Sequence, residues 1–259
     1  MALFTDANVV TEDDLLEYET ALDSIAASHG IDINTKITLA TNAIADKLML
    51  WLLNVGASDP QWMSRRLLGL STVVVTPTLQ RWLCFDSLSR FFSEAYNVQL
   101  NTRFDAKLTE YKSETERAAD AYFQSGVGIV YKPLPRPLVP LVSVETGSAP
   151  QGGLFVQTAW VNDIGEESAV SAVNGSVLTA SSSVVIGMAE GVLKAPPAAC
   201  GWNVYAGSTN DSLTRQNLAP LPIGATWQLP ATGLIDGPDA SGGQQPNCWI
   251  QLSRQIRRG

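Results

Sequence analysis

Apolar side chains recur at helical spacing through the first part of the chain. Four segments show this spacing, at residues 12–30, 34–54, 77–96 and 98–124. Thr11 with the acids that follow it resembles a capping box, and Thr76 before Pro77 is typical of a helix start. We therefore expect residues 1–130 to form a helical bundle.

Prolines crowd the segment that follows. They occupy positions 133, 135, 137 and 140 of the run YKPLPRPLVP. Because proline fixes its own φ and favours extended geometry in the preceding residue, we expect residues 131–140 to form a semi-rigid linker. A PxxP target for a partner is the alternative, but the abrupt change of composition at this point favours a linker.

Beyond the prolines the pattern becomes one of short strands separated by Gly, Asn, Ser and Pro. Such runs occur at residues 154–162, 182–188, 202–205 and 225–229. They predict an antiparallel β-sandwich over residues 141–245, which makes the chain an α+β protein with several domains. Trp160, Trp202 and Trp227 fall within these strands and are expected in the core. A stacking surface for sugars is the alternative.

The last segment, residues 246–259, differs from both domains. It belongs to the run QQPNCWIQLSRQIRRG, which combines large apolar side chains with arginines and contains no acid. A partner could bury the apolar groups and pair its own acids with the arginines, so we expect a docking arm. The candidate docking residues are Trp249, Ile250, Leu252, Arg254, Ile256, Arg257 and Arg258. In the alternative, residues 249–252 form the last strand of the sandwich and the arginines fray.

Charge is distributed unevenly along the chain, whose formal net charge is −8. Residues 1–23 contain seven acids and no Lys or Arg, whereas the last eleven residues contain three Arg and no acid. The overall negative charge argues against a general nucleic-acid binder, which needs a basic face. The two ends have opposite sign and could form complementary contact surfaces. A solvated helix face and a loose basic tail are the simpler alternative.

Three features bear on the cellular compartment. Cys84, Cys200 and Cys248 lie far apart in the sequence, which suggests free thiols in a reducing environment. The first residues lack the pattern of a secretory signal. No stretch approaches about eighteen consecutive apolar residues, so no membrane span is expected.

The sequence offers little material for catalysis. His29, the single histidine, precedes Gly30 and is expected to end a helix rather than to act in a catalytic triad. Neighbouring acids such as Glu166 and Glu167 are expected at solvated turns, and no HExxH, P-loop or paired-cysteine pattern occurs. We therefore expect no catalytic residue, no metal, no cofactor and no enzymatic activity.

The order of the parts carries a resemblance to a known family. The stretch TPTLQRWLCFDSLSRFFSEAYN, followed by a long helix ending AADAYFQSGVGIVYKPLPRPLVP, resembles the helical domain of head-to-tail adaptor proteins (connector or head-completion proteins) of tailed bacteriophages. The stretches GLFVQTAWVNDIGEESAVS and CGWNVYAGSTNDSLTRQNLAPLPIGATWQLPATGL are similar to the immunoglobulin-like or fibronectin-III-like domains of phage structural proteins. Together the two resemblances cover nearly the whole chain.

The adaptor resemblance implies a structural protein at the head–tail junction of the virion, assembled in the host cytoplasm. Such subunits form a ring, typically of twelve, beneath the portal and continue the DNA channel. The implied partners are the portal protein, reached by the C-terminal arm, a tail or nozzle protein, and further copies of the chain. DNA would pass through without sequence-specific binding, and acids of the N-terminal region would help it slide.

Two other function classes remain as alternatives. A tail, collar or surface protein could use the sandwich to hold a glycan or another structural protein, which would require exposed aromatic side chains. An enzyme acting on the cell wall would require a carboxylate pair or a metal set, which the sequence does not present.

Overall fold

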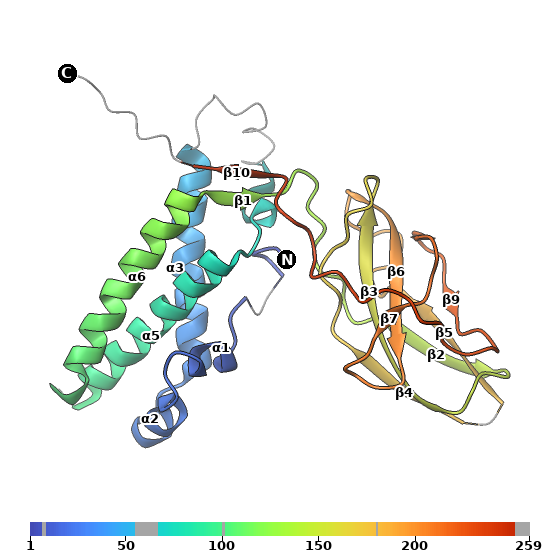
Figure 1. The fold of residues 1–259 in the computed structure, drawn as a ribbon, viewed down its shortest axis with the longest axis horizontal. Helices are drawn as coiled ribbons and strands as arrows, with labels where there is room; N and C mark the ends of the chain where they lie inside the picture. The colour runs from blue at the N-terminus through green and yellow to red at the C-terminus, as the bar shows by residue number, and fades with distance from the viewer. Residues whose placement is uncertain (7–8, 55–66, 100–101, 180, 252–259) are drawn as a thin grey trace. The chain divides into compact units, whose positions relative to one another are not determined.

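The structure is a computed structural model that describes residues 1–259 except for 7–8, 55–66, 100–101, 180 and 252–259. Helices and antiparallel sheets both occur, so the expected α+β class is confirmed. The chain divides into two units (Figure 1). The β unit consists of Met1–Asp6 and Lys132–Gln245, and the helical unit consists of Ala7–Tyr131 and Pro246–Gly259. The chain therefore passes between the units after Asp6, after Tyr131 and after Gln245.

The helical unit is built mainly from α-helices. Its described helices are α1 (Glu12–Leu16), α2 (Leu22–His29), α3 (Ile33–Asn54), α5 (Pro77–Gln99) and α6 (Asp105–Ser125), with 3-10 turns η1 (Gly69–Thr72) and η2 (Thr102–Phe104). The capping box at Thr11 is present, since its hydroxyl accepts the amide of Asp14 while the Asp14 carboxylate accepts the amide of Thr11. Gly30 ends α2 in the left-handed region, where glycine carries no steric penalty.

Two helix boundaries differ from the expected ones. Residues 12–30 form two helices, because the chain turns where the amide of Tyr18 donates to the carbonyl oxygen of Leu15. Leu15 and Leu22 are both buried and lie seven residues apart, so periodicity alone suggested one continuous helix. Further along, α5 continues through Gln99, and η2 buries Phe104 before the next helix begins.

Aromatic rings from α5 and α6 form much of the helical core. Trp82 and Tyr122 are fully buried, with their ring centroids 5.8 Å apart. Phe92 of α5 stacks on Tyr111 of α6 at 5.3 Å. Rings on two long helices therefore determine which faces of α5 and α6 meet.

The described residues of the β unit form two antiparallel sheets. Its strands are β2 (Leu141–Thr146), β3 (Gly152–Asn162), β4 (Asn174–Leu178), β5 (Ser182–Gly187), β6 (Ala199–Gly207), β7 (Thr214–Arg215), β8 (Leu221–Pro222) and β9 (Trp227–Gln228). One sheet has the strand order β4-β3-β6-β7, with β8 also paired to β6, and the other has the order β2-β5-β9. Side chains from both sheets meet in one apolar core.

The tryptophans of the β unit lie in that core, as expected from their positions within strands. Trp160 of β3 and Trp202 of β6 are register partners, and each is at most 1% exposed. Trp227 of β9 is 8% exposed and reaches the same core from the other sheet. These three rings are therefore buried, and they cannot form the sugar-stacking surface that was considered as the alternative.

The proline-rich segment is part of the β unit rather than a free linker. The residues between its prolines keep their amides, and three of these amides donate to side chains from distant parts of the chain. Leu134 donates to Gln244 at 2.6 Å, Arg136 to Asp6 at 2.8 Å and Leu138 to Glu190 at 2.5 Å. Leu134 itself is fully buried in the β core. The expectation that residues 131–140 form a linker between two domains was therefore wrong, since residues 132–140 belong to the β unit.

The first residues also belong to the β unit, although we expected them in the helical domain. Leu3 and Phe4 are buried, at 1% and 6% exposure. The carboxylate of Asp6 accepts the amides of Leu3 and Arg136 and so joins this segment to the proline run. Pairing between residues more than 100 positions apart is invisible to local sequence patterns.

Candidate docking interface

The candidate arm begins as a strand of the helical unit. Strand β10 (Cys248–Ile250) pairs antiparallel with β1 (Val127–Ile129), which follows α6 (Figure 1). Trp249 lies opposite Gly128 in this pairing. The alternative in which this segment closes the sandwich is therefore wrong, and so is a picture in which the whole of residues 246–259 is free.

Two glycines of the sequence SGVGIV allow the arm to approach β1. A Cβ added at Gly128 would lie 2.8 Å from Cγ of Pro246, closer than side chains tolerate. A Cβ at Gly126 would lie 3.4 Å from Cβ of Trp249, and Gly126 has a φ of +100°, which L residues rarely adopt. Close backbone approach is a common reason for glycine within a strand. The two glycines, one just before β1 and one within it, thus leave the space that the arm occupies.

Polar contacts hold the arm at both ends. The amide of Asn247 donates to the carbonyl oxygen of Ile129 at 2.9 Å, and the side-chain oxygen of Asn247 accepts the amide of Tyr131 at 2.8 Å. Beyond the strand, the side-chain amide of Gln251 donates to the carbonyl oxygen of Gln124 at 2.9 Å. These contacts fix residues 246–251 on the helical unit.

Among the described residues, strand β10 forms the edge of this small sheet. On the far side of β1, the amide of Val130 donates to Thr72 and the amide of Val74 donates to Gly128. Gly128 and Val130 thus direct their backbone groups away from β10. Because backbone groups alternate along a strand, the partner residue Trp249 directs its own N–H and C=O toward the open edge.

The side chain of Trp249 is 51% exposed at this edge, while those of Cys248 and Ile250 are half-buried. A half-exposed tryptophan presents a large apolar surface and an indole N–H to any partner that approaches. Of the remaining candidate docking residues, Leu252, Arg254, Ile256, Arg257 and Arg258 lie outside the described residues.

The histidine, one cysteine and the acid pair that the sequence offered as reactive groups are packed or hydrogen-bonded within the fold. His29 ends α2 and packs edge-on against Phe104, with ring centroids 5.4 Å apart. Burial raises the pKa of the Cys84 thiol to about 12, which keeps it protonated and unreactive. Glu166 and Glu167 are bound rather than solvated, since Glu167 accepts the Tyr205 hydroxyl and Glu166 accepts the side-chain amide of Gln244.

Acidic side chains gather at one shallow hollow of the helical unit. Glu12, Asp23 and Asp32 line it, together with the start of α3. The pKa of Glu12 is raised by desolvation and by the neighbouring Asp23 carboxylate, whereas hydrogen bonds from Thr35 lower the pKa of Asp32. Within the described ranges, no group of three or more His, Cys, Asp or Glu side chains is arranged to hold a metal ion.

Comparison with known proteins adds no relative: no family model matches the chain, and no curated sequence is significantly similar to it. The helices that the structure describes include none with both the length and the apolar character needed to cross a membrane.

Sequence reasoning missed the partner of the arm within its own chain. Gly126 and Gly128 follow the helical segment expected at residues 98–124, and they provide space for Trp249 and Pro246. A pair of glycines flanking Val127, just before the buried Ile129, was the available signal.

Proposed function

We propose that this chain is a structural virion protein that forms a ring between the capsid portal and the tail and continues the DNA channel. The observation that supports this proposal is the half-exposed Trp249 on the edge strand β10. Arg254, Arg257 and Arg258 follow this anchored strand in the sequence and supply positive charge for an acidic partner. A rigid anchor followed by a basic, partly apolar segment suits a protein that attaches to another assembly.

The physical basis of attachment is the burial of apolar groups by the portal. Each large apolar side chain contributes roughly 1.5–3 kcal/mol when it leaves water, before the cost of ordering the segment is subtracted. Because a ring repeats the contact in every subunit, the weak single contacts combine into a firm attachment. Anchoring residues 246–251 on the helical unit reduces the entropy lost on docking.

We further propose that the β unit is related to immunoglobulin-like and fibronectin-III-like domains. The order β7-β6-β3-β4 matches the G-F-C-C′ order of such a sheet. The other sheet departs from the pattern, since β9 follows β6 and β7 in sequence but pairs with β5. In the immunoglobulin arrangement every strand of the second sheet precedes strand F.

The test is co-sedimentation of purified chain with tailless capsids that carry the portal. The full chain should sediment with the capsids, and a chain ending at Gln251 should not, although it keeps every described contact of β10. Trp249→Ala should weaken attachment more than any single arginine substitution. A hot-spot tryptophan is worth at least about 2 kcal/mol, whereas one exposed ion pair is worth at most about 1 kcal/mol.

Charge reversal of Arg254, Arg257 and Arg258 together provides a second arm of the test. Attachment should weaken in a salt-dependent way, with the largest loss at low salt, because counterions screen interactions between exposed charges. Circular-dichroism melts of every variant separate lost docking from lost folding. A folded chain ending at Gln251 that still joins capsids would show that the docking proposal is wrong.

A further inference from the structure

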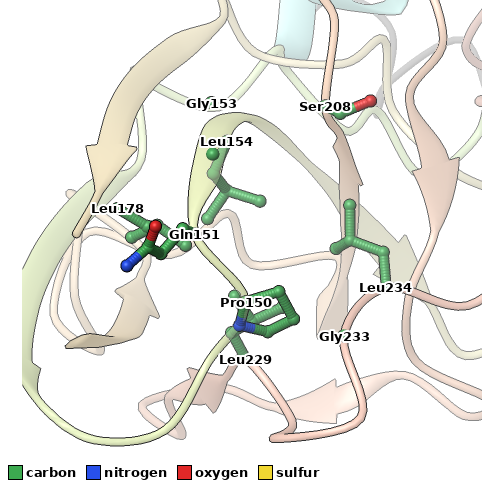
Figure 2. Close-up of a pocket in the computed structure, with 10 residues that line it drawn as sticks. Pro150, Gln151, Gly153, Leu154, Leu178, Ser208, Leu229, Gly233 and Leu234 are labelled. Carbon is green, nitrogen blue, oxygen red and sulfur yellow. The ribbon is translucent and has the colours of Figure 1, made fainter. Parts of the chain in front are cut away.

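An apolar pocket opens at one end of the β unit. Figure 2 shows it between the start of β3, the turn after β6 and the segment that follows β9. Its walls are mainly apolar and include Pro150, Leu154, Leu178, Leu229 and Leu234. Leu154, Leu178 and Leu229 belong to the core of the unit, so the pocket floor is rigid.

The size of the pocket suits one apolar side chain. Its volume is about 200 Å³. Sites for small-molecule ligands are usually larger, at roughly 300–1,000 Å³. A buried apolar cavity of about 150 Å³ is enough to take up benzene, so an isobutyl group fits the present pocket. The lining offers few polar groups that could orient a polar ligand, which again favours an aliphatic group.

The opposite end of the same unit carries a matching projection. The connection from β5 to β6 has the sequence GVLK at residues 191–194, and Leu193 at its tip is 99% exposed. The strands between the two ends are long: the eleven residues of β3 span about 35 Å. The projection and the pocket therefore cannot meet within one β unit.

The projection is supported by its surroundings. A Cβ at Gly224 would come within 2.6 Å of Cγ2 of Val192, so Val192 packs directly over that glycine. At the base of the loop, the Glu190 carboxylate accepts the amide of Leu138. Because the loop holds Leu193 in water, the exposed side chain carries an unfavourable free energy of hydration. Burial of this side chain in the pocket of a partner would remove that cost.

The charges beside the two features have opposite sign. Lys194 follows Leu193 at the tip. On the pocket side, Asp211 lies in the turn that begins at the lining residue Ser208, and Asp236 follows the lining residue Leu234 by two positions. All three side chains are exposed. Complementary charges at the rim of an apolar contact favour one orientation of approach.

We propose that β units of successive copies of this chain associate head to tail, with Leu193 of one copy inserted into the pocket lined by Leu154 and Leu234 of the next. The contact uses two different patches of the surface, so it is heterologous and leaves a free projection and a free pocket at the ends of every open oligomer. It closes only as a ring and otherwise extends as a filament. This self-association is independent of the proposed attachment to a capsid.

The test uses two variants of the full chain that disable opposite sides of the contact. Leu193→Asp removes the projection but keeps the pocket, and Leu234→Trp fills the pocket but keeps the projection. Sedimentation should show concentration-dependent growth of the unmodified chain, measured up to about 1 mM because a small contact is weak. For each variant alone, the dissociation constant of self-association should rise at least about tenfold, because the contact loses the burial of a leucine side chain.

Mixing the two variants gives the deciding result. An intact projection on one chain then meets an intact pocket on the other, so the mixture should form a one-to-one dimer that cannot extend. Leu218→Asp is the matched control, because Leu218 is 92% exposed on another loop and should associate like the unmodified chain. Melting curves show whether each variant is folded. If Leu234→Trp unfolds the chain, Ser208→Trp takes its place, because Ser208 is exposed and also lines the pocket.

Any of the following results would overturn the proposal. The first is an unmodified chain that stays monomeric over the whole concentration range. The second is a folded Leu193→Asp chain that still associates normally, or a mixture of the variants that does not form the dimer. The third is an equal loss in the Leu218→Asp control, which would indicate unspecific apolar contact.

Discussion

The amide of Leu134 donates a 2.6 Å hydrogen bond to the side-chain oxygen of Gln244, 110 residues further along the chain. Gln244 is 2% exposed, and its side-chain nitrogen donates to the carbonyl oxygen of Lys132 and to Glu166. One buried amide side chain thus holds the proline-rich segment against the β unit. Such a group is costly to lose because its partners have no water to replace it.

We expect Gln244→Ala to destabilise the β unit by about 1–3 kcal/mol, because the buried amide of Leu134 would lose its acceptor. Limited proteolysis should then cut within residues 131–140 faster than in the unmodified chain, where these residues should resist cleavage. Gln151→Ala, at an exposed position, is the control and should leave both measurements unchanged. Rapid cleavage of the unmodified chain at this segment would contradict the observed packing.

Gly128→Ala should displace the arm from its seat, since the new Cβ would lie 2.8 Å from Cγ of Pro246. Overpacking of this kind typically costs about 1–3 kcal/mol. Hydrogen exchange should show faster exchange at β10, and the helical unit should melt earlier. Gly187→Ala is the matched strand control, because its Cβ would meet its nearest neighbour at an ordinary 3.7 Å. Equal melting of the two variants would count against the proposed fit.

Truncation separates the anchored part of the arm from the residues beyond it. A chain ending at Gln245 loses β10 and uncovers Val127 and Ile129, which are both fully buried. We expect its helical unit to be destabilised by roughly 3 kcal/mol or more, from about 1.5–3 kcal/mol per exposed side chain. A chain ending at Gln251 should melt like the full chain. Denaturant titration followed by circular dichroism checks both, and unchanged stability at Gln245 would refute the role of β10.

The stability of the β unit should depend on pH through Asp6. Burial raises the pKa of its carboxyl above the usual 3.8, although the amides of Arg136 and Leu3 act in the opposite direction. The folded chain then binds a proton more tightly than the unfolded chain. Stability relative to Asp6→Asn should therefore be greatest below pH 3.8 and should fall as the pH rises through the folded pKa. Melting temperatures of both chains at several pH values measure this difference, and a rise would contradict it.

The cysteines should differ in reactivity. Burial raises the pKa of Cys84 to about 12, so almost no thiolate forms at pH 8. Cys200 is exposed. We expect a thiol reagent to label Cys200 quickly and Cys84 only after denaturant is added, with mass spectrometry identifying the labelled site. Fast labelling of Cys84 in the native chain would show that α5 opens readily.

Local patterns predicted much of the architecture. The helix starts at Thr11 and Thr76 and the buried tryptophans of the β unit were all predictable, because capping and strand burial depend on neighbours in sequence. The candidate docking residue Trp249 was also identified from sequence, and its side chain is half-exposed. Sequence reasoning was wrong about the contacts of three segments: the first six residues, the proline-rich run and the start of the C-terminal arm.

The sequence by itself determined the helical and strand content, the change of character near residue 131 and the apolar, basic nature of the C-terminal segment. Only the tertiary structure decided that Leu3 joins the β unit, that the amides between the prolines bind Gln244, Asp6 and Glu190, and that β10 pairs with β1. The physical reason is the range of the interactions. Helix periodicity and capping act over three or four residues, whereas an unpaired strand or a buried amide accepts any partner that the fold brings to it.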